Sequence, residues 1–301
     1  MREEARKVLR WSSMDRILIV GATGAVGGAV VEQLVAAGVP DVRALSRNPD
    51  AARLPPGIDV VHGDLTMPES LDNCLAGVAA VFLVWTAAAA LVPAAIERIA
   101  RTARRIVLLS SPYKTAHPLF LQPNPMRVMH AQLEAAIISS GMDWTFLRPG
   151  MFARNCLGWW APSIRLGDVV RWPYLGVPTA PVDERDIAAI AVQALTEDGH
   201  AGAEYVLTGP QSLTQAEQLS AIGRAIGRHI EVEEISPEKA RNELLSIMPA
   251  VVIDMLLSAW AAAQCQPAFV SHTLSEVTGA PPRSFSDWAV DHAHEFLGTA
   301  A

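Results

Sequence analysis

One segment near the N-terminus, residues 16–28, constrains the fold of this chain more than any other. A short apolar run at 16–20 has the character of a buried strand, and an apolar helical stretch follows at 25–37. The sequence GATGAVGG lies between them, so glycines stand at the turn from a strand into a helix. Glycines at this spacing and in this context are typical of a loop that binds the pyrophosphate of a dinucleotide.

Each of the three spaced glycines has a physical task in such a loop. Gly21 permits a tight turn, Gly24 lets the backbone approach a pyrophosphate, and Gly27 lets the helix pack close to the strand. The helix that follows directs free N–H groups and a positive dipole end toward the phosphates. The residues expected to contact the cofactor in this loop are Gly21, Thr23, Gly24, Ala25, Val26 and Gly27.

Strand-like and helix-like runs alternate through the first half of the chain. Strands are predicted at 16–20, 41–45, 58–62, 79–84, 105–110 and 143–148. Helices are predicted near 25–37, 68–75, 88–102 and 124–140. Such alternation requires right-handed crossovers and a parallel sheet covered on both faces. The predicted fold is therefore α/β, a Rossmann-type doubly wound parallel sheet of order 3-2-1-4-5-6, with a smaller C-terminal substrate lobe.

The pattern becomes irregular after Pro149. We expect an N-terminal extension at 1–14, a dinucleotide-binding domain at 15–150, and a mixed α/β substrate-binding lobe at 151–301. Part of that lobe is expected to return to the sheet, through a helix at 183–195 and a strand at 203–207.

Composition narrows the range of partners. The formal net charge is −7 and no basic block offsets it, which argues against nucleic acid as the main partner. Three widely spaced cysteines form no CxxC pair, which indicates a reducing compartment and neither a disulfide framework nor a zinc site. The apolar stretch at 78–95 contains Trp85, Thr86 and Pro93, and it reads better as a buried strand followed by a helix than as a membrane span. We therefore expect a cytoplasmic protein with a small-molecule substrate and no membrane partner, and leave its oligomeric state open.

The end of the second predicted strand bears on cofactor choice. A carboxylate usually stands there when the ribose 2′-hydroxyl of NAD is bound. Here Ser46 and Arg47 follow the strand, and a guanidinium pairs with a 2′-phosphate. The pattern favours NADPH, with NADH still possible, and leaves open that Arg47 is a solvated surface residue.

Two further strand ends face the same edge of the predicted sheet. Asp64 and Leu65 follow the third strand, where a carboxylate can accept a hydrogen bond from the adenine amino group. The backbone of Val84, Trp85 and Thr86, at the end of the fourth strand, is expected to line the adenosine half of the cofactor.

Several motifs together give the chain a family resemblance. They are GATGxxG at 21–27, GDL at 63–65, the paired serines at 110–111 and DWTFLRPG at 143–150. The chain resembles the atypical short-chain dehydrogenase/reductase superfamily and, within it, the NmrA-like NAD(P)H-binding group. It is most similar to actinobacterial members, some of which reduce quinones or polyketide-type aromatics.

The chain departs from that superfamily at the catalytic helix. The superfamily spaces its tyrosine and lysine as YxxxK, often with a glutamate four residues further on. Counting back from Glu134 places His130 at the lysine position and Met126 at the tyrosine position. Methionine cannot donate a proton. Tyr113 has the wrong spacing and is a weak substitute.

The resemblance implies roles for the remaining polar and aromatic residues. Ser111 and His130 are the expected catalytic residues, although a structural role for His130 stays open. Ser110 is expected to contact the cofactor, as are the residues that pass the nicotinamide, Pro149, Gly150, Met151 and Phe152. The expected substrate contacts are Tyr113, Phe152, Asn155, Trp159 and Trp160. For the tryptophans, a role in the core or an interface is the open alternative.

The resulting expectation is an NAD(P)H-dependent reductase that transfers hydride to a quinone-like or aromatic polyketide-type substrate. Hydride addition to a quinone gives a delocalised anion that takes its proton from water, so the missing tyrosine matters less than it would for a simple ketone. Such a reaction can support oxygen activation and hydroxylation in secondary metabolism, including antibiotic biosynthesis. The alternative is a non-catalytic NADP(H)-binding redox sensor. A sugar-nucleotide epimerase is disfavoured because that chemistry relies on the tyrosine.

Overall fold

The computed structural model describes residues 16–122, 125–167 and 169–298, so the extension expected at 1–14 lies outside the described residues. The chain divides into two compact units. The sheet unit comprises the chain up to Ser111 together with Pro125–Arg148 and Glu184–Tyr205. The C-terminal unit comprises Pro112–Asn124, Pro149–Asp183 and the chain from Val206 onward.

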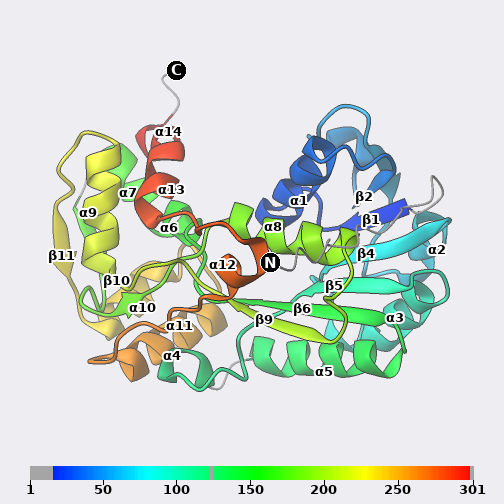
Figure 1. Ribbon diagram of the computed structural model, residues 1–301. Coiled ribbons are helices and arrows are strands. Elements are labelled where there is room, and N and C mark those ends of the chain that lie inside the picture. The colour runs from blue at the N-terminus through cyan, green and yellow to red at the C-terminus, as the bar shows by residue number, and fades with distance from the viewer. Residues whose placement is uncertain (1–15, 123–124, 168, 299–301) are drawn as a thin grey trace, which may run out of the picture. The chain divides into compact units, whose positions relative to one another are not determined.

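The sheet unit is built on a seven-stranded sheet of order β3-β2-β1-β4-β5-β6-β9 (Figure 1). Its strands are β1 Arg16–Val20, β2 Val42–Ser46, β3 Asp59–His62, β4 Val78–Val84, β5 Arg105–Leu109, β6 Asp143–Pro149 and β9 Ala203–Leu207. The first six strands pair in parallel, because each returns to the sheet through a helical crossover. The predicted order and the doubly wound α/β class are confirmed, and β9 adds the seventh strand beside β6.

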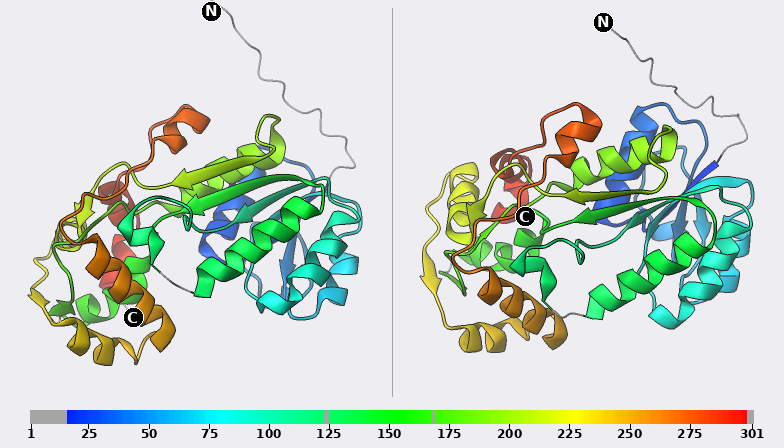
Figure 2. Two further views of the ribbon diagram at one scale, coloured as in Figure 1. Left: turned by 90° about the horizontal axis from the view of Figure 1, so that it is seen from below. Right: turned by 60° about the horizontal axis from the view of Figure 1, so that its bottom comes forward.

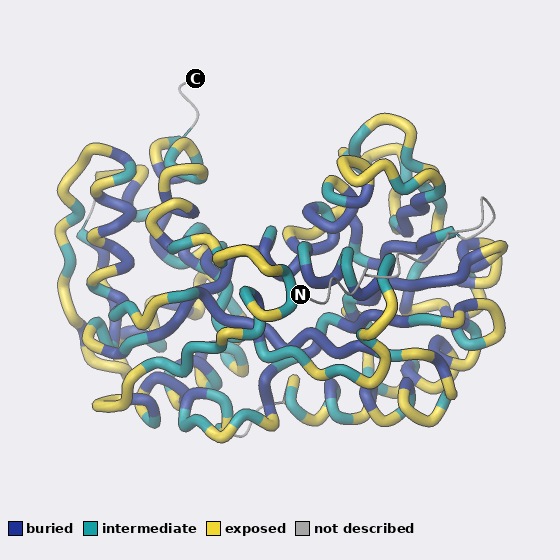
Figure 3. The backbone as a smooth tube through the Cα atoms, in the orientation of Figure 1, coloured by how far each residue is buried: buried dark blue, intermediate teal, exposed yellow. Residues whose placement is uncertain are grey.

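Helices cover both faces of this sheet (Figure 2). On one face α1 (Ala25–Ala36) packs against α8 (Glu184–Thr196), and α2 (Leu71–Cys74), α3 (Val92–Ala100) and α5 (Pro125–Ser139) are associated with the other. Side chains of successive β1 residues point to opposite faces of the sheet. Leu18 and Val20 share the face whose core lies under α3 and α5. Strands buried on both faces read as continuous apolar runs, and the central strands are accordingly buried along most of their length (Figure 3).

Short helical turns account for the differences from the predicted helices. The helix predicted at 88–102 begins as a 3₁₀ turn, η3 Ala89–Leu91, and becomes α-helical only at Val92, where Pro93 occupies the first turn. The helix predicted at 68–75 is likewise divided into η2 Pro68–Ser70 and α2, and a further 3₁₀ turn, η1 Pro49–Ala51, follows β2.

The C-terminal unit is mostly helical and has its own core. Two small sheets pair β7 Val170–Trp172 with β11 Val232–Glu234, and β8 Pro178–Thr179 with β10 Leu213–Thr214. The helices are α4 Pro118–Leu121, α6 Asn155–Trp159, α7 Ala161–Leu166, α9 Gln215–Ala225, α10 Pro237–Leu244, α11 Ala250–Ala263, α12 Thr273–Thr278, α13 Phe285–Asp291 and α14 Ala293–Leu297. Fully buried aromatic side chains fill the core, among them Trp160, Trp260, Trp288 and Phe296.

The two units interleave along the chain. The sequence predicts a single boundary near residue 150, whereas Pro112–Asn124 falls in the C-terminal unit and Glu184–Tyr205 in the sheet unit. The second segment is the part of the lobe expected to return to the sheet, and it does so because α8 packs on α1 and β9 lies beside β6. Among the helices described, none combines the length and apolar character that crossing a bilayer requires.

Candidate functional site

The glycine loop between β1 and α1 depends on two glycines for its shape. Gly21 has φ +91°, and a Cβ there would lie 2.8 Å from the Cβ of Val84. A Cβ on Gly27 would lie 2.1 Å from the carbonyl oxygen of Gly21, so any side chain would force the helix away from the loop. The tight turn and the close helix–strand packing expected of these residues are therefore geometric requirements of the loop.

The third glycine leaves the N-terminus of α1 open. Gly24 is the N-cap residue, with φ −87° and ψ 171°, and no side chain caps the helix there. A Cβ on Gly24 would meet only the carbonyl oxygen of Gly21, at 3.4 Å. The first-turn N–H groups of α1 thus have no side-chain acceptor at the cap, which is the arrangement that suits an anionic phosphate.

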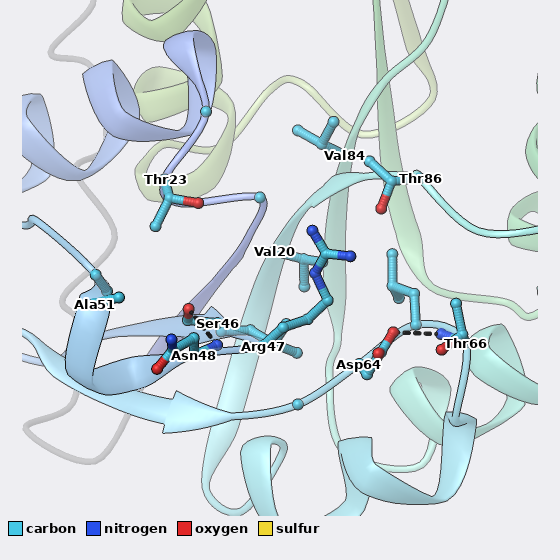
Figure 4. Close-up of a pocket in the computed structure, with 16 residues that line it drawn as sticks. Val20, Thr23, Ser46, Arg47, Asn48, Ala51, Asp64, Thr66, Val84 and Thr86 are labelled. Atoms are coloured by element: carbon cyan, nitrogen blue, oxygen red, sulfur yellow. Dashed lines mark hydrogen bonds between the residues drawn. The ribbon is translucent and has the colours of Figure 1, made fainter.

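A cavity of about 480 Å³ opens beside this loop, at the carboxyl ends of the strands (Figure 4). Nine residues predicted to bind the cofactor line it, namely Gly21, Thr23, Gly24, Ser46, Arg47, Asp64, Leu65, Val84 and Thr86. The other lining residues are Val20, Leu45, Asn48, Ala51, Ala52, Gly63 and Thr66. Ala25, Val26 and Gly27 lie in the first turn of α1 and are not among the lining residues.

Arg47 is the cation of this cavity. Its side chain is exposed and extends over the pocket toward Thr86 and Val84 (Figure 4). No ion pair joins it to a carboxylate within the described part of the chain, so its charge is not neutralised at contact distance. The neighbouring Ser46 accepts a hydrogen bond from the backbone N–H of Asn48 at 3.1 Å, which shapes the turn that presents Arg47.

Asp64 lies across the cavity from the glycine loop. Its Oδ1 accepts a hydrogen bond from the backbone N–H of Thr66 at 2.8 Å. The pKa of Asp64 is lowered, first by this backbone bond, then by the hydroxyl of Thr66 and, more weakly, by the charge of Arg47. Asp64 is therefore an ionised acceptor at neutral pH, with one oxygen already used in its own turn.

Trp85 and Ser110, also predicted to contact the cofactor, are not among the residues that line this cavity. Trp85 is only 6% exposed and packs in the core of the sheet unit, whereas its neighbours Val84 and Thr86 line the pocket. Adjacent residues of an extended chain point in opposite directions, which explains the difference. Ser110 is also buried, and its hydroxyl donates to Glu134 Oε1 at 2.6 Å.

Ser110 is part of a buried ionic network that the sequence did not predict. Arg148 donates through Nη2 to Glu134 Oε2 at 2.6 Å and through Nε to Glu134 Oε1 at 3.0 Å. A third guanidinium nitrogen of Arg148 contacts the carboxylate of Glu204. The network ties α5 to β6, to β9 and to the residue that follows β5. The only sequence signal for this network was the presence of two charged residues, Glu134 and Arg148, within otherwise apolar stretches.

The two predicted catalytic residues, Ser111 and His130, each have a buried polar atom in the side chain. Ser111 Oγ and His130 Nδ1 are buried and form no hydrogen bond among the described residues. Burial lowers the pKa of His130 and outweighs the opposing effects of the Glu134 charge and of the Met126 backbone, so the imidazole is neutral at pH 7. Four residues before it, Met126 is 46% exposed on α5. Buried polar atoms without a partner are uncommon, which makes these two atoms candidates for ligand contacts.

The residues expected beside the nicotinamide lie in the C-terminal unit. Met151 and Ala153 exchange backbone hydrogen bonds of 2.9 Å with Val182, which holds Phe152 in a short parallel bridge. Pro149 ends β6, and Gly150 N–H donates to Leu207 at 2.9 Å. Asn155, half-buried, begins α6.

The predicted substrate aromatics separate into core and half-buried residues. Trp160 is 0% exposed and packs against Trp172 with ring centroids 5.8 Å apart, so its position is that of a core residue. Trp159 is half-buried against the same core, 5.7 Å from Trp260. Tyr113 is 8% exposed. Of the predicted substrate aromatics, Phe152 and Trp159 are therefore the half-buried ones.

Comparison with known proteins decides the family. A family model described as NAD(P)H-binding matches residues 21–198, which include the glycine loop and every residue that lines the cavity except Val20. The chain belongs to the NAD(P)H-binding family. The resemblance to NmrA-like, atypical short-chain reductases is thereby confirmed, and NAD(P)H is the cofactor.

Relatives within the NAD(P)H-binding family are named as reductases. A (4-alkanoyl-5-oxo-2,5-dihydrofuran-3-yl)methyl phosphate reductase of Streptomyces griseus subsp. griseus is 37% identical over 291 residues, covering 93% of this chain and 99% of the relative. An NAD(P)H azoreductase of Xenophilus azovorans is 35% identical over 292 residues, covering 93% and 99%. The crystal structure of an NADPH-dependent quinone oxidoreductase of Escherichia coli superposes with a TM-score of 0.76 at 26% identity, covering 91% and 98%. The chain is accordingly an NAD(P)H-dependent oxidoreductase.

The local geometry fits the family's cofactor. Three features meet at one cavity. The N-terminus of α1 has no side-chain cap, Gly24 leaves room for a ligand, and Arg47 has no ion-pair partner in the described part of the chain. Sequence reasoning missed several small residues of that cavity, chiefly Asn48, Ala51, Ala52, Gly63 and Thr66. Gly63 had a sequence signal as the first residue of the GDL motif, and the structure shows why glycine stands there: a Cβ would lie 2.7 Å from both Cys74 Sγ and Leu45 Cδ1.

Proposed function

We propose that this protein is an NADPH-dependent reductase of electron-poor conjugated acceptors, of which quinone-like and aromatic polyketide-type compounds are the favoured class. One observation carries the proposal. The helix position at which the superfamily has its tyrosine is Met126, which cannot donate a proton, and the histidine four residues on is buried and neutral. A reaction at such a site must end in an anion that is stable without a strong acid from the enzyme.

The named relatives support this choice of acceptor. Their names indicate acceptors that contain an azo bond, a quinone, or a furanone ring double bond conjugated with two carbonyl groups. In all three, addition of two electrons and one proton places negative charge on a delocalised system. A simple ketone would instead give a localised alkoxide, for which a general acid contributes about 10²–10⁴-fold in rate.

Cofactor binding is assigned to the cavity of the sheet unit. The N–H groups at the start of α1 would hold the pyrophosphate, and Arg47 would pair with the 2′-phosphate of NADPH. Asp64, kept ionised by Thr66, would accept a hydrogen bond from the adenine amino group. When bound, the nicotinamide supplies the hydride equivalent, and the protein contributes position, orientation and exclusion of water.

Ser111 and His130 are proposed to bind the acceptor or the carboxamide that faces it. Ser111 Oγ can donate to an oxygen on which negative charge develops, and a neutral His130 can offer Nδ1 as donor or acceptor without adding a charge. Phe152 and Asn155, in the segment that follows β6, are proposed as further acceptor contacts.

The proposal extends to the fate of the product. A dihydroquinone can transfer two electrons and two protons to O₂, which regenerates the quinone and yields hydrogen peroxide. A reductase of this kind could therefore support a hydroxylation in secondary metabolism, including antibiotic biosynthesis.

Anaerobic NADPH oxidation against a matched panel tests the function. The panel contains substituted 1,4-benzoquinones and 1,4-naphthoquinones, an azo dye, an acylated unsaturated lactone and simple ketones. Turnover with the conjugated acceptors and none with the ketones is expected. Turnover with ketones alone would overturn the choice of acceptor. Tight binding of NADP⁺ and NADPH with no turnover on any compound would instead indicate a redox sensor.

A further inference from the structure

Three aromatic rings that no sequence motif singled out meet in the C-terminal unit. His117 is the N-cap residue of α4 and Phe120 lies within the helix; their ring centroids are 5.7 Å apart. Phe269, from the segment between α11 and α12, lies 6.4 Å from His117 and 6.2 Å from Phe120, edge-on to the latter. These three residues are called the aromatic frame below.

Hydrogen bonds hold the frame in place. His117 Nδ1 accepts from the backbone N–H of Leu119 at 3.2 Å and so caps α4. Nδ1 therefore carries no proton, and Nε2, 3.0 Å from the carbonyl of Pro267, is the donor that ties α4 to the segment of Phe269. The same segment is fixed at Ser271, whose N–H donates to Thr208 Oγ1 at 2.8 Å. The rings are therefore supported by two separate chain segments.

The frame adjoins the chain just after β6. A Cβ on Gly150 would lie 3.4 Å from Phe120 Cζ and 3.6 Å from Thr208 Cγ2, so the tip of the phenyl ring faces the Gly150 backbone. Gly150 follows the carboxyl end of β6, and ligands of doubly wound sheets bind outside these ends. A side chain at position 150 would occupy the space that the phenyl ring now faces.

The three residues of the frame are half-buried. His117, Phe120 and Phe269 are each neither buried nor fully exposed, in contrast to the wholly buried Trp160 and Trp260 of the same unit. Apolar rings held rigidly with part of their surface open are suited to stacking or edge contacts with another planar ring. Phe120 is one of the partly buried residues packed against the core of this unit.

We propose that Phe120 and Phe269 form the contact surface for a planar aromatic ring of the acceptor, and that they select fused-ring acceptors over single-ring ones. This inference rests on the proposed function for its enzymatic consequence. His117 is a positioning residue in it, because its two ring nitrogens are used within the protein.

Steady-state kinetics of Phe120→Leu and Phe269→Leu with NADPH test the inference. We expect KM for a 1,4-naphthoquinone to rise about three- to tenfold, the effect of one aromatic contact, with a smaller rise for a methyl-substituted 1,4-benzoquinone. Phe120→Tyr, which keeps the ring, should retain the wild-type ratio of the two KM values. An unchanged ratio in both leucine variants would overturn the assignment.

A binding measurement separates this inference from the proposed function. The dissociation constant of 2-naphthoate, which is not reducible here, is followed by its own fluorescence and should rise in both leucine variants. If the wild type turned over no acceptor but this shift persisted, the aromatic surface would stand and the proposed reaction would fall. Equal binding by wild type and variants would refute the surface. Phe285→Leu removes a buried ring of the same unit, stacked on Trp288, and should change stability without changing either readout.

Discussion

Arg148 and Glu134 form a buried ion pair, with Nη2 2.6 Å from Oε2 and side chains 3% and 2% exposed. The second carboxylate oxygen accepts from Ser110 and from Arg148 Nε, so every polar atom of Glu134 has a donor. A buried pair of this kind adds little net stability compared with apolar residues, yet removal of one partner leaves an uncompensated charge. The pair therefore fixes how α5, which carries Met126 and His130, lies on the sheet.

Arg148→Met should reduce the free energy of unfolding by about 3–5 kcal/mol, because Glu134 would then be buried without its counter-charge. The double variant Arg148→Met/Glu134→Leu should recover much of that loss. Denaturant unfolding measures both. Arg98→Met, which removes an ion pair with Asp72 that is 25% and 55% exposed, is the matched control and should cost about 0–1 kcal/mol. Similar losses in the two single variants would contradict the buried role.

Arg47→Ala should weaken NADPH binding about 10- to 100-fold, the loss of one charge-assisted pair, and change NADH binding little. The reason is that only NADPH carries a 2′-phosphate for the guanidinium. Isothermal titration with each reduced cofactor measures the ratio. Arg53→Ala is the control, since Arg53 is exposed nearby and does not line the cavity. Equal losses for the two cofactors in Arg47→Ala would exclude the 2′-phosphate role.

Gly27→Ala should destabilise the sheet unit and abolish cofactor binding, because the new Cβ would lie 2.1 Å from the Gly21 carbonyl oxygen. Gly28→Ala is the matched control one residue later. Its Cβ would meet only the carbonyl oxygen of Ala22, at 3.5 Å, and alanine should stabilise α1 by about 0.5–1 kcal/mol. Thermal unfolding with and without NADPH reads out both effects. A Gly27→Ala protein that still gained stability from NADPH would disprove the close-packing requirement.

His130 should make stability depend on pH. Burial lowers its pKa in the folded protein, so above the unfolded value of about 6.5 the residue is neutral in both states and contributes nothing. Below that value the unfolded chain takes up the proton first, and stability is lost as the pH falls. The melting temperature of the wild type should therefore fall more than that of His130→Gln between about pH 7.5 and about pH 5.5. His229→Gln, at an exposed histidine, should follow the wild type; identical curves for all three would rule out this role for His130.

Local signals in the sequence were enough for the sheet and the glycine loop. The spacing of Gly21, Gly24 and Gly27 encodes a backbone shape that side chains would prevent, and the apolar runs encode strands buried on both faces. Strand ends of a doubly wound sheet meet at one edge, so the positions of Arg47 and Asp64 beside the loop followed from the strand order. These properties depend on residues close together in the chain, or on topology that the strand–helix alternation determines.

Only the tertiary structure decided which residues lie together across long separations. Trp85 and Trp160 are apolar aromatics whose burial depends on what packs over them, and the sequence could not distinguish core from site. Ser110 reads as a hydroxyl at a strand end, and its bond to Glu134 depends on how α5 crosses the sheet. The aromatic frame brings together Phe120 and Phe269, which are 149 residues apart in the chain. Hydrophobic burial is non-directional, so side-chain pairing of this kind follows from packing and not from local sequence.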